Sequence, residues 1–436
     1  MNILLLGSGG REHAFAWKIK QSKLCTNLYI SPGNAGTSEL GENTDISVND
    51  FNAIKKLCRR KKIELVFVGP EEPLVKGIYD YFESDKKLKK IIIIGPSLEA
   101  AQLEGSKSFA KAFMQRHNIP TAAYQSFDET NYTSGLEYIK NHSLPVVLKA
   151  DGLAAGKGVL ICLNHIEAMS EYELMIQNAK FGEAGRKVVV EEFLSGLELS
   201  VFVLTDGKNY LLFPEAKDYK RVGESDTGLN TGGMGAISPV PFAGEAFMQK
   251  VITRIIEPTI AGLQKENLVY TGFIFFGLIK VGDDPLVIEY NCRMGDPESE
   301  VVLLRLQNDL VQLFVAASEK KLNEEKIIID PRYAATTMAV SGGYPGEYET
   351  GKIIDFGYLE NSDSKKHIDA DGGVVVFQAG TKKFNGATVT NGGRVLAVSA
   401  LGDTLGEAIE LSKEILGKIY FDNMHYRKDI GYEFIR

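Results

Sequence analysis

VVLKADGLAAGKGV, residues Val146–Val159, is the segment on which the interpretation of this chain rests. Its apolar start leads to Lys149, which indicates the end of a buried strand. Asp151–Gly158 then predicts a loop, because glycine allows backbone angles that other residues avoid and lets the backbone approach a ligand closely. Successive N–H groups of such a loop can surround phosphate oxygens, with Lys149 and Lys157 as nearby cations. Taken alone, the segment leaves a tight hairpin with surface lysines open as an alternative.

Acidic residues further along the chain favour the phosphate-binding interpretation. Glu191 and Glu192 directly follow the predicted strand Lys187–Val190, where a side chain could contact the polar groups of adenine or ribose, with a charged strand end as the alternative. Glu289 and Asn291 lie two apart on another predicted strand, so their side chains point to the same face. A carboxylate and an amide oxygen suit a hard cation such as Mg²⁺, completed by nucleotide phosphates. These patterns together predict a site for a nucleotide and a divalent cation.

The N-terminus predicts the start of a doubly wound α/β domain. Asn2–Leu6 indicates a buried parallel strand, and the glycine-rich turn Gly7–His13 leads into a helix whose N-terminus could bind an anion. The turn departs from the dinucleotide fingerprint GxGxxG, because Glu12 stands at the last glycine position. No acid closes the second predicted strand, Leu28–Ile30, to hold a ribose diol. The turn is therefore interpreted as a site for a single phosphate, with a turn needed only for packing as the alternative.

The alternation of strands and helices continues to about residue 100. Leu65–Val68 and Ile91–Ile94 predict two more strands, each followed by a glycine turn. In open α/β sheets, ligands bind beyond the carboxyl ends of the strands. Glu71 lies in the turn after Leu65–Val68 and is a candidate polar contact there, with a solvated loop acid as the alternative.

Two further segments lie between the N-terminal part and Ile327, where the sequence pattern changes. Residues 122–190 alternate short strands with a helix and predict a small α+β lid around the lysine- and glycine-rich segment. PEAKDYKR, residues Pro214–Arg221, precedes GLNTGGMG, residues Gly228–Gly235. The second stretch is too glycine-rich for a helix or strand and is interpreted as a ligand loop. From Ile327 onward, strands divided by glycine turns and a final helix predict a separate small α+β domain.

The chain is therefore predicted to be a multidomain α/β and α+β protein. Its length of 436 residues exceeds what one hydrophobic core usually supports. We expect an N-terminal doubly wound parallel-sheet domain over residues 1–102, which binds substrate. A central domain that carries the lid is expected over 103–326, and a C-terminal α+β domain over 327–436.

Composition and charge argue against several classes of function. The charged and hydrophobic fractions, 24% and 44%, are ordinary for a soluble globular protein, and the net charge of −8 gives no support for binding nucleic acid. No apolar stretch approaches the roughly 20 residues that span a bilayer, and the N-terminus lacks the basic region of a signal peptide. Four scattered cysteines without a CxxC pair argue against a structural zinc site or disulfides, so we expect a cytoplasmic protein.

The ordered motifs of the chain resemble those of the ATP-grasp superfamily and, more narrowly, those of the phosphoribosylamine–glycine ligases, also called glycinamide ribonucleotide synthetases. The resemblance runs nearly from end to end. Each glycine motif alone is weak, but the ordered set is highly specific. It consists of GSGGREHA at 7–14, GPEEPL at 69–74, KADGLAAGKGV at 149–159, NTGGMGAISP at 230–239, EYNCRMGDPE at 289–298 and YRKDIG at 426–431.

This resemblance implies an activity and its partners. The family uses ATP to join glycine to 5-phosphoribosylamine, giving glycinamide ribonucleotide, ADP and phosphate in purine biosynthesis. We expect the reaction to pass through glycyl phosphate, so that no nucleophile from the protein is needed. The implied partners are these three small molecules and Mg²⁺ or Mn²⁺, with no nucleic acid and no membrane. We expect a monomer or a weak homo-oligomer.

The resemblance also implies roles for residues at matching positions. Lys107 and Lys149 are expected to hold ATP phosphates, and Glu191 the adenine. The whole expected ATP site is Lys107, Lys149, Gly156, Lys157, Gly158, Glu191, Glu192, Phe193, Leu194 and Glu198, in which the Phe193–Leu194 backbone contacts adenine and Glu198 the ribose. The expected metal ligands are Glu289 and Asn291. The expected substrate site is Gly9, Gly10, Glu71, Asp218, Lys220, Asn230, Thr231, Gly232, Gly233 and Arg293.

Glycine itself needs a site with both signs of charge. We expect Arg293 to hold its carboxylate and Asp218 its ammonium, which with Lys149 makes three expected catalytic residues. The chain departs from the family at Tyr219, where histidine is common between the aspartate and the lysine, so the role of this position is open.

Three other functions remain as alternatives. Another carboxylate–amine ligase or a carboxylase could use the same scaffold, although the N-terminal turns and NTGGMG favour the glycine enzyme. A nucleotide-sensing protein without turnover is disfavoured by the intact pair Glu289 and Asn291. A dehydrogenase is disfavoured by Glu12 in the place of a fingerprint glycine.

Overall fold

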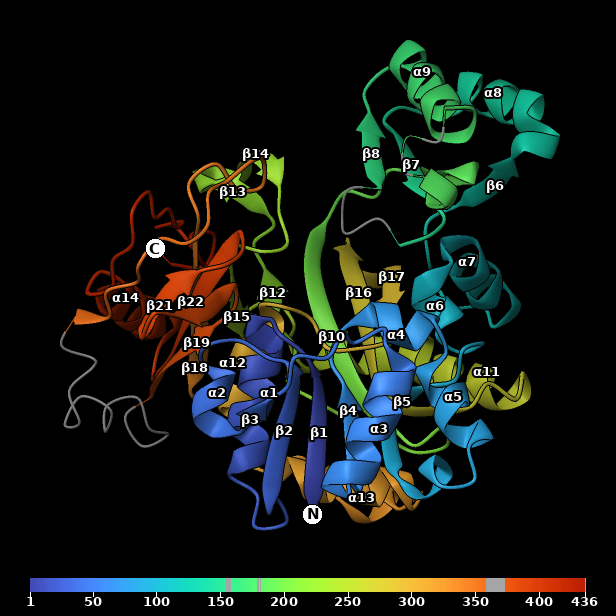
Figure 1. The fold of residues 1–436 in the computed structure, drawn as a ribbon. Coiled ribbons are helices and arrows are strands. Elements are labelled where there is room, and N and C mark those ends of the chain that lie inside the picture. The colour runs from blue at the N-terminus through green and yellow to red at the C-terminus, as the bar shows by residue number, and fades with distance from the viewer. Residues whose placement is uncertain (154–157, 179, 181, 358–372, 436) are drawn as a thin grey trace.

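The computed structural model describes residues 1–153, 158–178, 180, 182–357 and 373–435. Figure 1 shows a broad body from which a small lid projects at the upper right, with the C-terminal sheet at the left and the N-terminus at the bottom. Gly156 and Lys157, two residues of the predicted phosphate loop, lie outside the described residues.

Five parallel strands form the N-terminal sheet in the order β3-β2-β1-β4-β5, which confirms the predicted doubly wound parallel sheet. These strands are buried because their sequences are short apolar runs. The elements are β1 (Asn2–Gly7), α1 (Gly10–Lys20), β2 (Asn27–Pro32), α2 (Thr37–Leu40), β3 (Glu42–Asn43), α3 (Phe51–Lys61), β4 (Leu65–Val68), α4 (Glu71–Val75), α5 (Ile78–Ser84), η1 (Leu88–Lys90) and β5 (Ile92–Pro96).

The central sheet continues from the N-terminal one, because β5 pairs antiparallel with the first residues of β16. β16 pairs with β10 on one edge and β17 on the other, and β10 pairs with β11. The elements are α6 (Gln102–Gly105), α7 (Lys107–Arg116), β10 (Leu197–Thr205), β11 (Tyr210–Leu212), α10 (Glu245–Val251), η5 (Ile252–Ile256), α11 (Glu257–Lys265), β16 (Tyr270–Val281), β17 (Asp284–Asn291), α12 (Glu298–Arg305), α13 (Leu310–Ser318) and η6 (Leu322–Glu324).

The lid is a four-stranded antiparallel sheet in the order β6-β9-β7-β8, with two helices packed against it. In chain order, the strands lie alternately at the edge and in the middle of the sheet. The core of the lid is formed largely by apolar residues of β7 and β9 together with those of α9. The elements are β6 (Tyr124–Asp128), η2 (Glu129–Asn131), α8 (Tyr132–Lys140), β7 (Val146–Ala150), β8 (Val159–Cys162), α9 (His165–Ile176), η3 (Gly182–Arg186) and β9 (Lys187–Glu192).

The C-terminal part is an antiparallel sheet in the order β12-β15-β18-β22-β19, with α14 packed on β18 and β22. The predicted loop of Gly228–Gly235 is partly wrong, because Thr227–Asn230 forms strand β14, which pairs with β13 across a tight turn. Backbone pairing overrides the low strand propensity of glycine there. The elements are β12 (Lys217–Asp218), β13 (Arg221–Gly223), η4 (Glu224–Asp226), β14 (Thr227–Asn230), β15 (Gly235–Ser238), β18 (Tyr333–Val340), β19 (Val374–Gln378), β20 (Thr381–Phe384), β21 (Ala387–Thr390), β22 (Arg394–Gly402) and α14 (Leu405–Leu416).

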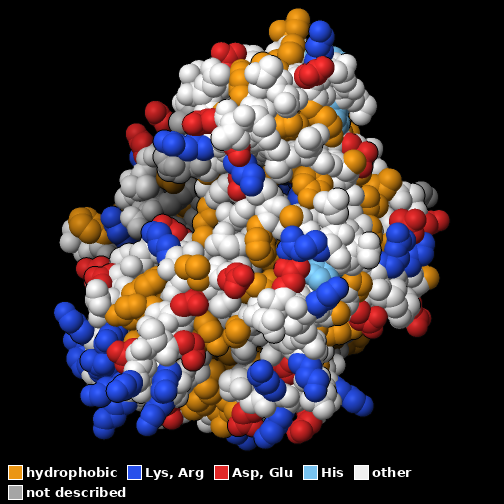
Figure 2. All heavy atoms as spheres, turned by 90° about the vertical axis from the view of Figure 1, so that its right-hand side faces the viewer, with side chains coloured by type: hydrophobic (Ala, Val, Ile, Leu, Met, Phe, Trp, Pro, Cys, Tyr) orange, Lys and Arg blue, Asp and Glu red, His pale blue; other side chains and the backbone are white. Residues whose placement is uncertain are grey.

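One group of basic residues lies at the end of the molecule opposite the lid. The last turn of α3 and the short helix η1 are basic, and each precedes a strand of the N-terminal sheet. They therefore lie at the amino edge of that sheet, and Figure 2 shows Lys and Arg side chains at the lower end of the molecule. No helix of the described residues is long and apolar enough to cross a membrane.

Candidate active site

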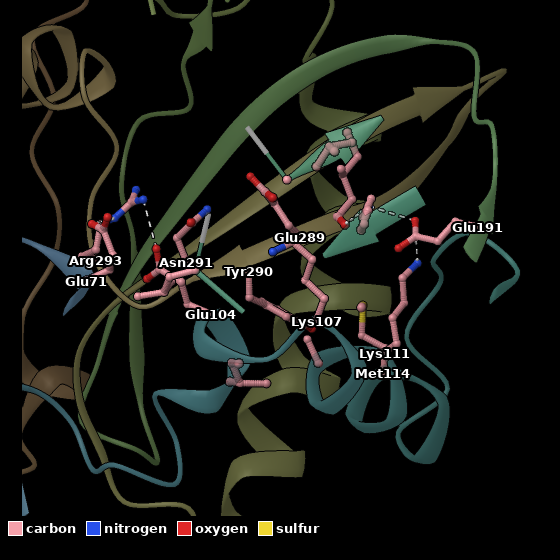
Figure 3. A pocket seen from close by; sticks show the side chains of 17 residues that line it. Glu71, Glu104, Lys107, Lys111, Met114, Glu191, Glu289, Tyr290, Asn291 and Arg293 are labelled. Atoms are coloured by element: carbon pink, nitrogen blue, oxygen red, sulfur yellow. Dashed lines mark hydrogen bonds and ion pairs between the residues drawn. The ribbon is translucent and has the colours of Figure 1, made fainter. Parts of the chain in front are cut away.

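A pocket lies where the lid meets the N-terminal domain and strand β17 (Figure 3). Eight of the predicted site residues line it, namely Glu71, Lys107, Lys149, Gly158, Glu191, Glu289, Asn291 and Arg293. The other lining residues are Leu103, Glu104, Ala110, Lys111, Met114, Leu153, Val159, Ile288 and Tyr290. Segments far apart in the sequence thus converge on one cavity.

The end of the pocket nearest the lid holds a buried group of two lysines and one glutamate. Lys149 Nζ lies 2.9 Å from Glu191 Oε2 and donates a hydrogen bond to the carbonyl of Ile288 at 3.2 Å. Lys111 Nζ lies 3.1 Å from the same Glu191 oxygen, and Figure 3 shows the two side chains pointing toward each other. Glu191 Oε1 is buried and finds no hydrogen-bond partner within the described part of the chain. Sequence reasoning missed Lys111, although it lies four residues after Lys107 and so on the same helix face.

Helix α7 brings Lys107 to the floor of the pocket. The helix begins there because Ser106 Oγ accepts a hydrogen bond from the Phe109 N–H at 3.1 Å and so caps its first turn. Asp151 Oδ1 accepts from the Ser108 N–H at 2.6 Å and ties the lysine- and glycine-rich segment to this helix. Lys107 Nζ donates to the Gly152 carbonyl at 3.1 Å, and burial lowers the pKa of its ammonium. Lys107 is thus held beside the loop that follows β7.

Glu289 and Asn291 line the opposite wall, on the last residues of β17. Backbone pairing with β16, in which Gly277 faces Glu289 and Phe275 faces Asn291, fixes their place. Among the described residues, no group of three or more His, Cys, Asp or Glu side chains gathers to hold a metal unaided. The donor set therefore fits a hard cation that takes one carboxylate and one amide oxygen from the protein and its remaining ligands from phosphates and water.

Arg293 occupies the far end of the pocket between two acids. Its Nε donates to Glu71 Oε2 at 3.3 Å, its Nη2 lies 3.0 Å from Glu104 Oε1, and its Nη1 donates to the Met294 carbonyl at 3.4 Å. Figure 3 shows the three side chains together. Burial raises the pKa of Glu104, which sequence reasoning missed, to about 7. These contacts use three of the five N–H groups of the guanidinium, so two remain for a ligand.

Asp218 and Lys220 lie outside the residues that line this pocket, at the start of the C-terminal sheet. Lys220 Nζ lies 2.7 Å from Glu198 Oε2, with both side chains about half exposed. Burial raises the pKa of Asp218. Tyr219 points the other way, is buried, and donates its hydroxyl hydrogen to Glu433 Oε2 at 3.0 Å. The departure from the family at position 219 therefore affects the contact with the C-terminal tail.

The predicted substrate residues 230–233 follow the hairpin β13–β14 and also lie outside the pocket lining. Thr231 Oγ1 donates to the Lys220 carbonyl at 2.8 Å, and the Gly232 N–H donates to Tyr344 Oη at 2.9 Å. Gly233 has φ of +119°, and a Cβ there would lie 2.4 Å from Pro297, so this position requires glycine. The segment thus runs beside Lys220 with a fixed backbone.

The glycine turn at the N-terminus is closed by carboxylates of the chain itself. The Gly9 N–H donates to Glu12 Oε2 at 2.6 Å, and the Arg11 N–H donates to Asp296 Oδ2 at 3.3 Å. A Cβ on Gly10 would lie 2.4 Å from Glu300 Oε1. Glu12 therefore caps α1 where a fingerprint glycine would leave room for a pyrophosphate, and the tight packing around Gly10 fits the packing interpretation of this turn.

The remaining predicted residues follow Glu191 along the chain as it leaves the lid. Glu192 Oε1 accepts a hydrogen bond from the Ala123 N–H at 2.8 Å, so it joins the two strands that connect lid and body. Phe193 is exposed and Leu194 is half-buried. Glu192, Phe193, Leu194 and Glu198 do not belong to the residues that line the pocket as it stands.

Comparison with known proteins connects this geometry to a family. Sequence models of the phosphoribosylglycinamide synthetase family match in order, with the N domain at residues 1–104, the ATP-grasp (A) domain at 105–299 and the C domain at 334–433. The chain is 45% identical to the phosphoribosylamine–glycine ligase of Escherichia coli strain K12 and 44% identical to that of Vibrio cholerae. Each alignment covers 100% of this chain and 99% of the relative.

Solved structures agree with the sequence comparison. The crystal structure of phosphoribosylamine–glycine ligase from Thermotoga maritima is similar with a TM-score of 0.84 and 33% identity, covering 98% of this chain and 100% of that one. A biotin carboxylase domain from Hydrogenobacter thermophilus is similar with a TM-score of 0.71 at 16% identity, covering 97% of this chain and 91% of that one. At that identity the second likeness concerns the fold alone, and it agrees with the predicted ATP-grasp architecture.

Proposed function

The chain belongs to the phosphoribosylglycinamide synthetase family, and on that premise we propose that it joins glycine to 5-phosphoribosylamine at the expense of ATP. The products are glycinamide ribonucleotide, ADP and phosphate, as in purine biosynthesis. One observation carries the proposal beyond the family: eight predicted site residues from five separate segments of the chain line one pocket. They supply lysines for phosphates, oxygen donors for a cation and a guanidinium for a carboxylate.

The first step activates the carboxylate of glycine, which is a poor electrophile. Its oxygen attacks the γ-phosphorus of ATP, the bond to ADP breaks, and glycyl phosphate forms. Lys149 and Lys107 hold the phosphates, with the backbone amide of Gly158 beside them, so that charge on the transferring group is offset. Glu289 and Asn291 would hold Mg²⁺ or Mn²⁺, which when bound neutralises phosphate oxygens. Gly156 and Lys157 belong to this loop by prediction.

The second step forms the amide. The amine of phosphoribosylamine attacks the acyl carbon of glycyl phosphate, the bond to phosphate breaks, and the amine loses a proton. Because water would hydrolyse the acyl phosphate, the lid must exclude it while the amine enters. No side chain needs to form a covalent bond with substrate.

Recognition of glycine needs a cation and an anion close together. Arg293 is held in place by Glu71 and Glu104 and keeps two N–H groups for the carboxylate of glycine. Asp218 is proposed for the ammonium, and closure of the lid is proposed to bring the parts of the site together. Gly9, Gly10, Lys220, Asn230, Thr231, Gly232 and Gly233 stay predicted contacts of phosphoribosylamine.

The nucleoside part of ATP is assigned to the lid end of the pocket. Glu191 is proposed to bind adenine, supported by its buried position and its unpaired oxygen. Glu192 and the backbone of Phe193 and Leu194 are proposed to lie along the adenine edge, and Glu198 beside the ribose. The pair of Glu198 with Lys220 is half exposed, so it can open to admit a hydroxyl group.

A steady-state assay tests this function. With ATP, glycine and freshly made phosphoribosylamine, ADP should form together with glycinamide ribonucleotide. Omitting either acceptor substrate should reduce ADP formation to slow leakage. Equal ADP release with another amino acid in place of glycine would contradict the proposed substrate, and release with bicarbonate instead would favour a carboxylase.

Three further assignments complete the proposal. The family models meet between residues 104 and 105 and resume at 334, which supports domain limits near 102 and 326, with the lid over about 122–190. All four cysteines are free, which supports a reducing cytoplasm. A monomer or weak homo-oligomer is proposed, and sedimentation at micromolar and tenfold higher concentrations would test it.

A further inference from the structure

Lys111 is a buried lysine whose donors are all in use. Its ammonium lies 3.1 Å from Glu191 Oε2 and donates to Thr121 Oγ1 at 2.8 Å and to the Ala122 carbonyl at 3.3 Å. An ammonium has three N–H donors, so these three contacts leave none for a ligand. Lys149 differs, because its contacts with Glu191 and Ile288 use two donors and leave a third for the pocket. Lys111 therefore acts on the site through another residue.

The residue through which it acts is Glu191. Two ammonium groups share Glu191 Oε2, whereas Oε1 is buried and has no hydrogen-bond partner among the residues that the structure describes. A buried acceptor without a hydrogen bond is energetically unfavourable. Because Glu191 lines the pocket, a ligand that brings a hydrogen-bond donor to Oε1 would remove this cost.

The same contacts join the body to both strands that connect it with the lid. Lys111 belongs to α7 in the body, whereas Thr121 and Ala122 lie where the chain enters the lid and Glu191 where it leaves. Thr121 Oγ1 in turn donates to the Val287 carbonyl of β17 at 2.6 Å. Removing the ammonium would loosen the orientation of Glu191 and the lid's attachment together.

We propose that Lys111 is a positioning residue of the nucleotide site. It holds Glu191 by one carboxylate oxygen and so presents the other to the amino group of the purine base. The inference rests on the proposed use of ATP. It adds that Lys111, through Glu191, makes the site prefer a purine base with an amino group over one with a keto oxygen. A keto oxygen at that position would face Oε1 as a second acceptor.

The charge state of the group is consistent with this role. Burial lowers the pKa of Lys111 to about 8, so the ammonium still carries its proton at neutral pH. The alternative is a buried ion pair that only stabilises the fold. The two roles differ in their effect on base selectivity, which a purely structural pair would not change.

Calorimetric titration with ADP and with inosine diphosphate tests the proposal without using the ligase reaction. Wild type should bind ADP at least about tenfold more tightly than inosine diphosphate, since a hydrogen bond to a charged group is worth about that much or more. Lys111→Met should weaken ADP binding by about tenfold or more and bring the two affinities close together. Lys111→Arg, which keeps the charge, should recover part of the preference. Arg116→Met, on the exposed last turn of α7, is the matched control and should bind both as wild type does.

A double-mutant cycle adds the link to Glu191. If Lys111 acts through this carboxylate, Lys111→Met should have little further effect on ADP affinity in a Glu191→Gln background. Additive losses, or a folded Lys111→Met with wild-type affinity and base preference, would overturn the inference. If Lys111→Met does not fold, Lys111→Gln, which also lacks the ammonium, is compared in its place, and an unchanged base preference overturns the inference equally. A wild-type protein that binds no ADP would instead overturn the proposed function.

Discussion

The lid and the C-terminal sheet are both small α+β units, but they are joined to the body in different ways. The buried residues of the lid form a cluster of their own, with members between Phe127 and Val190. The C-terminal strands form a cluster with α14 on one face, but their other face shares a cluster with the N-terminal domain, in which Met338 and Phe377 pack with residues such as Phe15. A unit with its own core can move or open alone, whereas a unit that shares a core cannot move without exposing it.

This difference separates the site into a movable part and a fixed part. Lys149, Gly158 and Glu191 belong to the lid, and Glu289 and Asn291 to the central sheet. We therefore expect changes in the lid to alter nucleotide affinity and water exclusion, and changes in the sheet to alter the chemical step.

Two leucine-to-alanine substitutions test whether the lid has a core that is separate from that of the body. Leu148 in the lid and Leu303 in the shared cluster are both fully buried. Each change to alanine should cost about 2–5 kcal/mol by removing packed atoms and leaving a cavity. Leu148→Ala should speed hydrogen exchange within residues 124–192 alone, whereas Leu303→Ala should lower the melting temperature of the body. Faster exchange in β1 or β16 of Leu148→Ala would mean that the lid is not a separate unit.

Acid should weaken the fixed attachment of the C-terminal sheet. His13 Nδ1 accepts a hydrogen bond from the Gln378 N–H at 2.7 Å, which requires an unprotonated nitrogen, and burial lowers its pKa from 6.5 to about 4. Because the unfolded chain binds the proton more readily, this stability is complete above pH 6.5 and is lost as the pH falls through 4. The loss amounts to about 3 kcal/mol.

Denaturant unfolding at pH 7.5 and pH 4.5 measures this loss. The difference between the two pH values should shrink in His13→Gln, which cannot take up the proton. His425→Gln, at an exposed histidine, is the control and should keep the wild-type difference. An equal pH dependence in His13→Gln would assign the acid sensitivity to other groups.

A change on the fixed side of the site should affect turnover. Glu289→Gln keeps the shape of the side chain but removes one negative charge from the proposed cation site. We expect kcat to fall by about a hundredfold, or about 2.7 kcal/mol, with folding and lid exchange unchanged. Steady-state kinetics measures the turnover, and calorimetry measures the melting temperature of the same preparation. Near wild-type turnover with a lower melting temperature would make Glu289 a structural residue.

Much of the fold could be predicted because it follows from local patterns. Apolar runs and glycine turns placed β1, β4 and β5 within a few residues of their observed bounds. The strand Thr227–Asn230 could not be predicted, since its glycine lacks strand propensity and only pairing with β13 stabilises it. The sharing of a core between the first and last parts of the chain is likewise a property of packing, which no local pattern records.

The site could be predicted where residues are joined by a motif and not where they meet only in three dimensions. Lys149 and Glu289 stand in recognisable stretches and line the pocket. Glu104 stands in no such stretch, and its role depends on reaching Arg293 across the fold at 3.0 Å. Lys111 had a helical signal, four residues from Lys107, but its contact with Glu191 depends on the lid strand lying beside α7.

The smallest expected effect concerns Tyr219, on the fixed side where the family commonly has histidine. The ring lies near the guanidinium of Arg427 at 5.3 Å, and the hydroxyl donates to Glu433 Oε2, so the side chain belongs to the contact between β12–β13 and the C-terminal tail. Asp218 and Lys220, its neighbours on an extended segment, point to the other side. Tyr219→Phe should therefore cost about 1 kcal/mol of stability for one lost hydrogen bond and leave kcat and the KM for glycine unchanged. Thermal unfolding and steady-state kinetics together decide the matter. Reduced turnover at an unchanged melting temperature would mean that the hydroxyl takes part in the reaction. The fixed part of the active site would then extend to the contact with the C-terminal tail, contrary to what the contacts of Tyr219 indicate.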